Sequence, residues 1–505
     1  MKKHVSIFLS GLILVALFTT CTPIEGTILE VLEKAGGGGY TVTFVVNGGT
    51  PAPQPQKIER GGKAEDPGTV SLFDVEFGGW YTELSFIKKW DFDKDTVTKN
   101  INLYAKWNFI LPLTNVNLVA PYLISQINGN NAANPVVLPV EIALGNMTAG
   151  ESGWRNLLNA IETANKYVNL DLTICTMTGI EFNPNSLVSD GKEKIVSIIL
   201  PDAAEAIVDG SYSFVPFNNF SSLTDVSGSN IRFIGIYAFC EISSLINVNF
   251  PKTEIIGNYS FYTCTSLKNI SFPSAVSFGA NAFANCTNLE NIEFSAEADI
   301  HATGPFYGCP KLTFTLNGDG FLSTIEGGRA LVRNGNELIS YPSASGTLNY
   351  GGDGKITTIG TYAFHENKAL QSVMFLDVTD IKSAFSGCTS LQYIYFPNAT
   401  TIASRAFDYC DLHSVSLPKI THIEGAFFWL NNSPYLTITL GPNAPTLGGQ
   451  IFLGASAKDV TIIVSTLATG YTSDWIEGFK GRGFDEYGLK SGEVNDNINV
   501  IIEYY

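Results

Sequence analysis

Histidine and cysteine are the residue types of this chain best suited to metal binding or nucleophilic catalysis, but their spacing indicates neither. The five histidines are His4, His301, His365, His413 and His422. None belongs to an HExxH motif or to a Ser-His-Asp arrangement. The chain has no CxxC or HxxxH spacing and no GxxxxGK(S/T) loop. We therefore expect no catalytic residue, no metal and no cofactor. The 47 acidic residues leave open one enzymatic alternative, a carboxylate pair in a groove of the fold.

The cysteines follow a period instead. The chain has eight, and seven remain when Cys21 is set aside, so the odd number excludes a fully paired disulfide framework. Five of them share one position of a repeat, namely Cys264, Cys286, Cys309, Cys388 and Cys410. The first two are 22 positions apart, and so are the last two. We interpret these five as small buried thiols that stack from one repeat to the next.

A phrase of about 22 residues surrounds these cysteines. One copy reads Ile256-Gly257, Ser260-Phe261, Cys264, Leu267, Ile270 and Phe272-Pro273. A fixed period of this length predicts a solenoid of stacked coils. Five large apolar side chains per coil contribute roughly 1.5–3 kcal/mol each on burial, or about 10 kcal/mol together. Ordering each backbone residue costs about 1–2 kcal/mol, so one coil of this length cannot fold alone and must stack on others.

The phrase resembles the BspA-like subclass of leucine-rich repeats, whose signature is IG..AF..C..L..V.FP. We place the repeats at 231–464, with a hairpin insert at 317–355 whose turn is Asn334-Gly335. A degraded coil contains Ala426-Phe427. The resemblance implies a mainly β fold, a leucine-rich repeat solenoid, and adhesion to host proteins or to other bacteria. Solenoids of this kind present a long surface to a partner more often than a catalytic pocket.

Residues 40–107 predict a separate small domain. TVTFVVNGG is followed by GGK, GGWYTE, WDFD and INLYAKW, an order that resembles the internalin-type B repeat of bacterial surface proteins. The resemblance implies a β-grasp-like module. Its aromatic residues are Phe44, Trp80, Tyr81, Trp90, Phe92, Tyr104 and Trp107. We interpret them as the core of the module, because a domain of this size needs every large side chain it has.

The first 20 residues predict an export signal. Lys2, Lys3 and His4 precede an apolar stretch that is too short to span a bilayer comfortably. The segment ends in Leu17-Phe18-Thr19-Thr20-Cys21, which resembles a bacterial lipobox, although Thr20 stands where that motif prefers Gly, Ala or Ser. The resemblance implies lipidation of Cys21, and ordinary secretory cleavage is the alternative. Residues 21–39 then form a tether that ends in four glycines. We expect membrane attachment through the lipid only, at the cell surface or outer membrane.

The net charge of the chain argues against some partners. It is −17 over 505 residues, and −19 once Lys2 and Lys3 are removed with the signal. A chain of this charge repels nucleic acid and anionic lipid over most of its surface. We therefore expect no nucleic-acid partner.

Two non-repeat segments flank the coils. Residues 108–230 are expected to link the module to the solenoid and to cover its first coil, with a helix at 153–164 and strands at 167–175 and 195–200. Residues 465–505 are expected to cap the far end. A solenoid needs such covers because its terminal coils would otherwise expose their apolar interior.

The candidate binding surface is the set of outward positions on the repeat strands, which flank the inward Ile or Val of each strand. These residues are Asn247, Asn249, Asn269, Ser271, Asn291, Glu293, Ser372, Met374, Tyr393, Tyr395, Ser414 and Ser416. Tyr393 and Tyr395 differ from the rest because exposed Tyr is common at interface hot spots, although Tyr is also an ordinary strand residue. The predicted function is adhesion to a host or bacterial surface or matrix protein. The alternative is a glycan-binding or envelope-structural role.

Overall fold

The computed structural model describes residues 39–72, 75–185, 191–424, 433–448, 459–479 and 499–504. It divides the chain into two units, Met1–Asn108 and Phe109–Tyr505. The predicted signal at 1–20, the lipidation site Cys21, and the tether up to residue 38 lie outside the described residues, as does the Ala426-Phe427 pair. None of the described helices is both long and apolar enough to cross a membrane.

The first unit is a small mixed β-sheet domain. Strands β1 (Tyr40–Val45), β2 (Gln56–Ile58), β3 (Glu76–Tyr81) and β4 (Ile101–Asn108) lie in the order β2-β1-β4-β3. The β1–β4 pair is parallel, and the two outer pairs are antiparallel. Four of the seven predicted core aromatics, Phe44, Trp80, Trp90 and Trp107, are at most 7% exposed, whereas Tyr81, Phe92 and Tyr104 are half-buried. A Cβ at Gly49 would come within 2.3 Å of the Trp107 ring, so this turn requires glycine.

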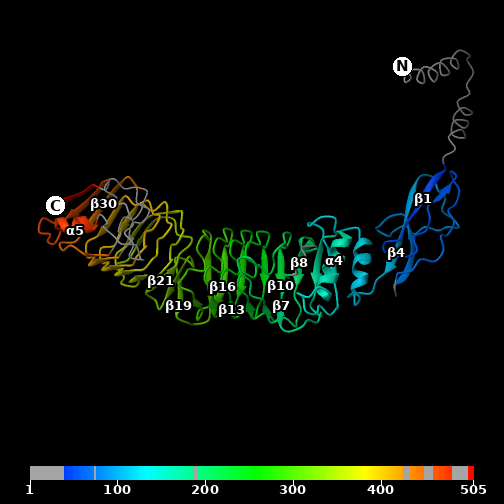
Figure 1. The fold of residues 1–505 in the computed structure, drawn as a ribbon, viewed down its shortest axis with the longest axis horizontal. Helices are drawn as coiled ribbons and strands as arrows, with labels where there is room; N and C mark the ends of the chain where they lie inside the picture. Colours follow the sequence, from blue (N-terminus) through cyan, green and yellow to red (C-terminus); the bar gives the residue numbers. More distant parts are fainter. Residues whose placement is uncertain are drawn as a thin grey trace, which may run out of the picture. The chain divides into compact units, whose positions relative to one another are not determined.

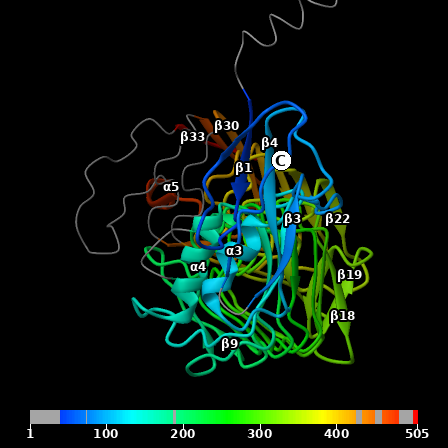
Figure 2. The ribbon, with the colours of Figure 1, turned by 90° about the vertical axis from the view of Figure 1, so that its right-hand side faces the viewer.

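The second unit is a solenoid whose coils stack through two ladders of parallel strands (Figure 1). The longer strands form what we call the long-strand face, and the two-residue strands form the short-strand face. Figure 2 places β18 and β9 on different sides of the coils. We refer to residues 136–317 as the first half of the solenoid and to 337–504 as the second half.

The long-strand face contains β5 (Val136–Pro139), β6 (Val168–Asp171), β8 (Ile195–Ile199), β10 (Asp225–Ser227), β12 (Asn247–Asn249), β14 (Asn269–Phe272), β16 (Asn291–Ser295) and β18 (Thr313–Asn317) in the first half. In the second half it contains β22 (Gly346–Tyr350), β24 (Leu370–Phe375), β26 (Tyr393–Tyr395), β28 (Ser414–Leu417), β30 (Tyr435–Leu440), β32 (Asp459–Val464) and β33 (Asn499–Tyr504). The register joins equivalent repeat positions, for example Ile270 with Ile292 and Ile394 with Val415.

The short-strand face contains β7 (Glu181–Phe182), β9 (Ala206–Ile207), β11 (Phe233–Ile234), β13 (Ile255–Ile256), β15 (Ser277–Phe278) and β17 (Asp299–Ile300) in the first half. In the second half it contains β23 (Thr358–Ile359), β25 (Asp380–Ile381), β27 (Thr401–Ile402), β29 (His422–Ile423) and β31 (Thr446–Leu447). In nearly every one of these strands the second residue is buried and the first is not. The first residues therefore form a row of outward side chains along the short-strand face.

The strand ladder begins before residue 231, where the repeats were expected to start. Strands β5 and β6 lack the repeat phrase, but they add in parallel to β8, which pairs in turn with β10. Their buried residues Val136, Leu138, Val168, Leu170 and Ile198 continue the same apolar core. Backbone pairing and one inward apolar row are sufficient for stacking, so the full phrase is not required.

Helices cover the beginning of the solenoid. The short turn η1 (Val116–Leu118) leads into α3 (Val119–Ile124), and α4 (Gly153–Ala164) packs against both. The bounds of α4 match the predicted helix. The Ser152 side chain accepts a hydrogen bond from the Arg155 backbone N–H at 3.2 Å, which caps the helix N-terminus. Trp154, Leu157 and Ile161 are fully buried on one face. A second turn, η2 (Lys192–Lys194), precedes β8.

The predicted insert contains the expected hairpin but also part of the ladder. Strands β19 (Leu322–Ile325), β20 (Ala330–Arg333) and β21 (Glu337–Ser340) form an antiparallel meander. Asn334 and Gly335 turn it with φ of 52° and 72°. However, β21 and β22 also pair in parallel with β23 and β24, so residues 337–350 contribute to a coil. The insert predicted at 317–355 therefore includes residues, 337–350, that belong to a coil.

The far end is described in part. Strand β33 adds to β32 in parallel, and α5 (Ser473–Phe479) lies before it in the chain. The Trp475 indole N–H donates to the Pro445 carbonyl at 2.8 Å, and the Tyr471 hydroxyl donates to the Gly441 carbonyl at 2.8 Å. These contacts attach residues 471–479 to the last repeat coils, which is the place expected of a cap.

Candidate binding surface

The interior of the coils contains a stack of Phe rings, and most of these rings have a Cys three residues further along the chain. Neighbouring rings are nearly parallel, with centroids 5.1 Å apart for Phe239–Phe261, 5.0 Å for Phe261–Phe283 and 4.8 Å for Phe364–Phe385. Such contacts add to the apolar burial of each ring. The rings are fully buried. This arrangement explains why the phrase repeats: each Phe packs on the Phe of the next coil.

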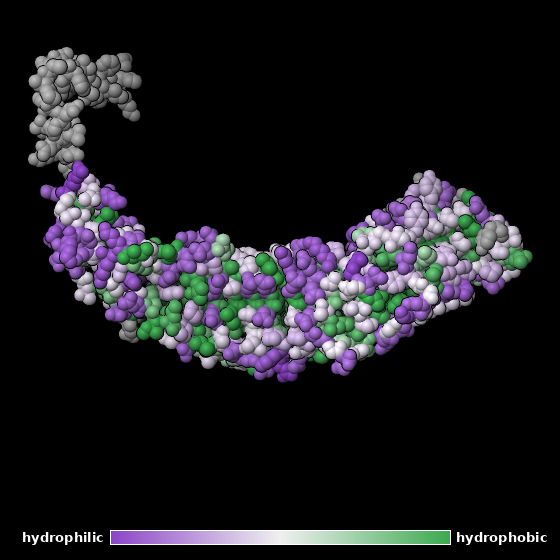
Figure 3. Space-filling model, turned by 180° about the vertical axis from the view of Figure 1, so that it is seen from behind, coloured by the Kyte–Doolittle hydropathy of each residue, from purple (hydrophilic) through white to green (hydrophobic). Residues whose placement is uncertain are grey.

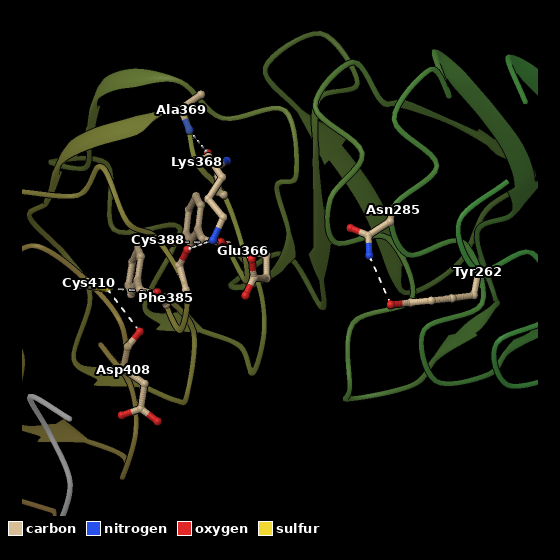
Figure 4. A network of polar contacts seen from close by, with 12 residues as sticks. Tyr262, Asn285, Glu366, Lys368, Ala369, Phe385, Cys388, Asp408 and Cys410 are labelled. Atoms are coloured by element: carbon tan, nitrogen blue, oxygen red, sulfur yellow. Dashed lines mark hydrogen bonds and ion pairs between the residues drawn. The ribbon is translucent and has the colours of Figure 1, made fainter. Parts of the chain in front are cut away.

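Each repeat Cys forms a hydrogen bond to the preceding coil. Its Sγ donates to a Phe carbonyl, at 3.1 Å for Cys286 with Phe261, 3.0 Å for Cys388 with Phe364 and 3.2 Å for Cys410 with Phe385. Figure 4 shows Cys410 facing the Phe385 carbonyl. Burial raises the pKa of Cys388 to about 12, so the thiol stays protonated. The interpretation of these cysteines as buried structural thiols is confirmed by their burial.

Two coils have another residue in the Cys position, Ile242 in the first half and Asn367 in the second. Asn367 stands in the Cys position, and its side-chain amide donates to the Pro342 and Ala344 carbonyls at 3.2 and 2.9 Å. Its side-chain oxygen accepts from the Ala369 and Leu370 backbone N–H groups. The preceding coil comes from the hairpin region and has Tyr341 in place of Phe. The longer Asn side chain reaches carbonyls that a Cys at this position would leave unpaired.

The four histidines of the described residues do not converge on a site. Nδ1 of His301 lies 2.7 Å from the Thr303 hydroxyl, Nδ1 of His413 lies 2.9 Å from the Asp411 carbonyl, and the ring of His365 packs between Tyr307 and Tyr362. Burial lowers the pKa of His365. Within the part of the chain that the structure describes, no group of three His, Cys, Asp or Glu side chains is placed to hold a metal ion.

On the first half of the long-strand face, the outward side chains bond to one another from coil to coil. Asn247 donates to Asp225 at 2.7 Å, and Ser271 donates to Glu293 at 2.7 Å. Thr315 donates to Asn291 at 2.9 Å. The hydrogen bond from Ser271 lowers the pKa of the Glu293 carboxyl. A partner that docked here would have to compete with these bonds.

On the second half of the same face, three tyrosines stand out. Tyr393 is 50% exposed, Tyr395 is 41% exposed and Tyr435 is 66% exposed. The ring of Tyr393 stacks on the ring of His413, with centroids 6.2 Å apart. Tyr435 lies two strands further along the same sheet. We call Tyr393, Tyr395 and Tyr435 the tyrosine surface.

The outward direction of the candidate residues follows the predicted alternation. Asn247, Asn249, Asn269, Ser271, Tyr393 and Tyr395 are exposed, and Asn291, Glu293, Ser372, Met374, Ser414 and Ser416 are half-buried. The residue between each pair is buried. The structure places the set on three sheets: β12 ends one sheet, β14 and β16 belong to a second, and β24, β26 and β28 belong to a third. Strands β19–β21 lie between the second and the third in the chain. Sequence reasoning missed Tyr435, which the alternation Tyr435-Thr437-Thr439 would have placed on the same face.

A band of hydrophobic residues also runs along the repeat region between hydrophilic ones, on the side shown in Figure 3.

Comparison with family models gives two matches. The model described as the BspA type leucine rich repeat region matches six copies, over residues 190–322 and 355–471. The model described as the Listeria-Bacteroides repeat domain matches residues 40–106.

Two curated relatives match a short part of the chain. A putative membrane protein of Evansella cellulosilytica is 38% identical over 68 residues, which are 14% of this chain and 10% of that protein. A putative Gly-rich membrane protein of the same organism is 37% identical over 68 residues, 14% of this chain and 8% of that protein. The chain thus spans about a tenth of the length of the curated relatives it matches.

Among solved structures, a leucine rich cell surface protein of Faecalibacterium prausnitzii is 21% identical with a TM-score of 0.35, covering 56% of this chain and 82% of that one. The pneumococcal vaccine antigen PcpA is 15% identical with a TM-score of 0.33, covering 66% of this chain and 86% of that one. These values are too low to carry an argument. The family models and the strand ladders together show that the solenoid of this chain is built from BspA-type leucine-rich repeats and that a Listeria-Bacteroides repeat domain precedes it.

Proposed function

We propose that this chain is an exported surface protein that adheres to a host or bacterial surface or matrix protein through its tyrosine surface, without catalysis. The observation that carries the proposal is the exposure of Tyr393, Tyr395 and Tyr435 on one sheet face, at 50%, 41% and 66%. Tyr supplies a large, rigid, amphipathic contact area at low conformational cost, which is why it is enriched at interface hot spots.

The neighbourhood of these tyrosines favours contact. Ser414 and Ser416 lie beside Tyr393 and Tyr395 in register, and they are small. Within the described residues, no side chain–side chain hydrogen bond ties up these two serines. A partner therefore contacts exposed aromatic rings that project beyond small polar side chains. On the first half it would instead meet side chains that already bond to one another.

The test is binding of the full chain to immobilised matrix proteins and, in parallel, to a glycan array. We expect saturable binding to a protein, and we expect the double variant Tyr393→Ala/Tyr395→Ala to weaken it by more than about 1 kcal/mol at an unchanged melting temperature. Calcium-independent binding to glycans with none to proteins would instead favour the glycan-binding role. An unchanged protein affinity of the variant would remove the tyrosine surface as the site.

Attachment to the membrane through Cys21 is part of the same proposal. Two or more acyl chains on this residue would hold the protein stably at a membrane, at about 0.8 kcal/mol per buried methylene. The names of the curated relatives, both membrane proteins, agree with an exported location. Labelled fatty acid should enter the full chain and should not enter Cys21→Ser. Equal labelling of both would contradict lipidation at this residue.

A further inference from the structure

The short-strand face of the first half carries exposed apolar side chains. Ile180 is 51% exposed, Phe233 36%, Ile255 41% and Val276 47%. In the second half, the outward residues of the short strands are all polar: Thr358, Asp380, Thr401, His422 and Thr446. The repeat itself does not demand apolar residues here, since half of the solenoid folds without them.

Beside these side chains the first half has an open furrow of about 720 Å³. A glycine follows each of three successive short strands, at Gly235, Gly257 and Gly279, and all three line the furrow. A Cβ on any of them would come within 2.3 to 2.7 Å of the preceding coil, so close stacking requires glycine there. The side chains on either side of the glycine row form the two walls.

The second half lacks this row. The residues in the corresponding positions are Gly360, Lys382, Ala403, Glu424 and Gly448. Lys382 reaches across the face and its Nζ lies 2.7 Å from the Glu337 carboxylate. The furrow is therefore a feature of the first half rather than of the repeat.

The charge in the furrow is negative at both ends. Along the wall that holds Phe233 and Ile255, Glu181 lies at one end and Asp299 at the other. Two further titratable residues line the furrow, His301 close to Asp299 in the chain and Asp209, which accepts a hydrogen bond from the Ile236 backbone N–H at 2.8 Å. Of the described residues that line the furrow, none is Lys or Arg. The adjacent Arg232 is paired with Glu254, with two contacts of 2.9 and 3.0 Å. The wall is thus apolar in the middle and acidic at its ends.

The dimensions fit an extended chain. Six short strands line the furrow, so its five steps of about 4.8 Å give a length of about 24 Å. An extended peptide advances about 3.3 Å per residue, so about seven residues fit. Their side chains alternate between two directions, which matches a furrow with two different walls.

We propose that this furrow binds an extended segment of a partner protein, about seven residues long, with apolar side chains in its centre and a basic side chain near each end. The basic groups meet Glu181 and Asp299, and the apolar groups meet Phe233 and Ile255. This site is on a different sheet and a different half from the tyrosine surface, and it does not depend on the function proposed there.

The test uses two labelled peptides of one composition. The first is Lys-Ser-Leu-Ser-Leu-Ser-Lys, and the second is Leu-Ser-Lys-Ser-Lys-Ser-Leu, with the charges in the centre. Fluorescence anisotropy with the full chain at low salt should show the first binding on the order of tenfold more tightly. The two peptides carry the same charge, so general attraction to an acidic protein cannot produce this difference.

Two matched variants locate the site. Asp299→Lys should abolish the preference between the peptides, because it reverses the charge at one end of the furrow. Asp380→Lys makes the same change at the equivalent strand position of the second half and should preserve the preference, as a control for net charge. Ile255→Lys should weaken binding of the first peptide, because it puts a charge in the apolar centre of the furrow. Glu181 and Asp299 at the two ends stay unchanged in this variant.

Several outcomes would overturn the proposal. These are equal affinity for the two peptides, equal effects of Asp299→Lys and Asp380→Lys, or binding of a linear oligosaccharide that Ile255→Lys abolishes while neither peptide binds. Self-association of the chain that Ile255→Lys abolishes, again without peptide binding, would assign the furrow to a second copy instead.

Discussion

In the first half of the solenoid, Ser271 and Glu293 are bonded to each other on the long-strand face, and three glycines leave a furrow on the short-strand face. In the second half, Tyr393 and Tyr395 stand exposed on the long-strand face, and Lys382 spans the short-strand face. The interiors do not differ in this way, since both halves stack Phe rings and bond each Cys of the repeat position to a Phe carbonyl. The difference shows that the repeat phrase constrains the inside of a coil and leaves its outside free to vary.

The largest expected effects test the shared interior. Phe283→Ala in the first half and Phe385→Ala in the second each remove a fully buried ring that packs between two others. We expect each to lower the free energy of unfolding by about 3–5 kcal/mol, and by similar amounts. Denaturant unfolding followed by circular dichroism measures this. A cost in one half below about 1 kcal/mol would show that the interiors are not equivalent.

The next effect concerns the one coil in which Asn replaces Cys. Asn367→Ala leaves the Pro342 and Ala344 carbonyls without their donor, so we expect a loss of about 1–3 kcal/mol in the free energy of unfolding. Asn367→Cys should recover little of this loss in the free energy of unfolding, because one Sγ cannot reach both the Pro342 and the Ala344 carbonyl. If Asn367→Cys proved as stable as the parent, the carbonyl contacts would not explain the exception.

A pH effect should distinguish the halves further. Asp408 in the second half is buried, and desolvation raises the pKa of its carboxyl to about 7, from an ordinary value of 3.8. The residues that follow the stacked Phe in the first half are Cys240, Tyr262, Ala284 and Tyr307, and none of them is a carboxylic acid. Because the folded pKa is raised, the contribution of Asp408 to stability is full below about pH 4 and is lost as the pH rises through about 7.

Asp408→Asn removes this titration. The variant should therefore become more stable relative to the parent as the pH rises from 4 to 7, measured by thermal unfolding across that range. Ala284→Ser, at the equivalent position of the first half, serves as the control and should show no pH-dependent difference. A constant difference between Asp408→Asn and the parent at every pH would contradict the raised pKa.

The smallest effect tests the bonds on the first half of the long-strand face. Ser271→Ala removes the hydrogen bond that is the largest cause of the lowered pKa of Glu293. The pKa of this carboxyl should move up toward its ordinary value, as followed by nuclear magnetic resonance. Stability should change by less than about 0.5 kcal/mol, because the site is at the surface. An unchanged pKa would show that Ser271 does not hold this carboxylate in solution.

The sequence predicted the parts of this fold that repeat. The 22-residue spacing of Cys264 and Cys286 indicated the stacked coils, and alternation around Ile270 and Ile394 indicated which strand residues point outward. Both signals are local, since they follow from the period of one coil and from the two-residue period of a strand.

What the sequence did not predict depends on contacts between segments without the phrase. Strands β5 and β6 join the ladder through backbone pairing, which the repeat phrase does not reveal. Tyr341 takes the place of a repeat Phe in the coil in which β21 pairs with β23, where its ring packs on Phe364. The furrow arises from the glycine row together with the side chains around it. Each glycine was visible as part of an Ile-Gly or Phe-Gly pair, but the space that they leave appears only when the coils are stacked.

The central claim, that recognition rests on what differs between the halves, has a direct test. Tyr393→Asn/Tyr395→Ser gives the second half the residues that the first half has at Asn269 and Ser271. The account predicts that affinity for a protein partner of the full chain falls by about tenfold or more, measured by calorimetry, while the melting temperature stays the same. An unchanged affinity in a folded variant would contradict it.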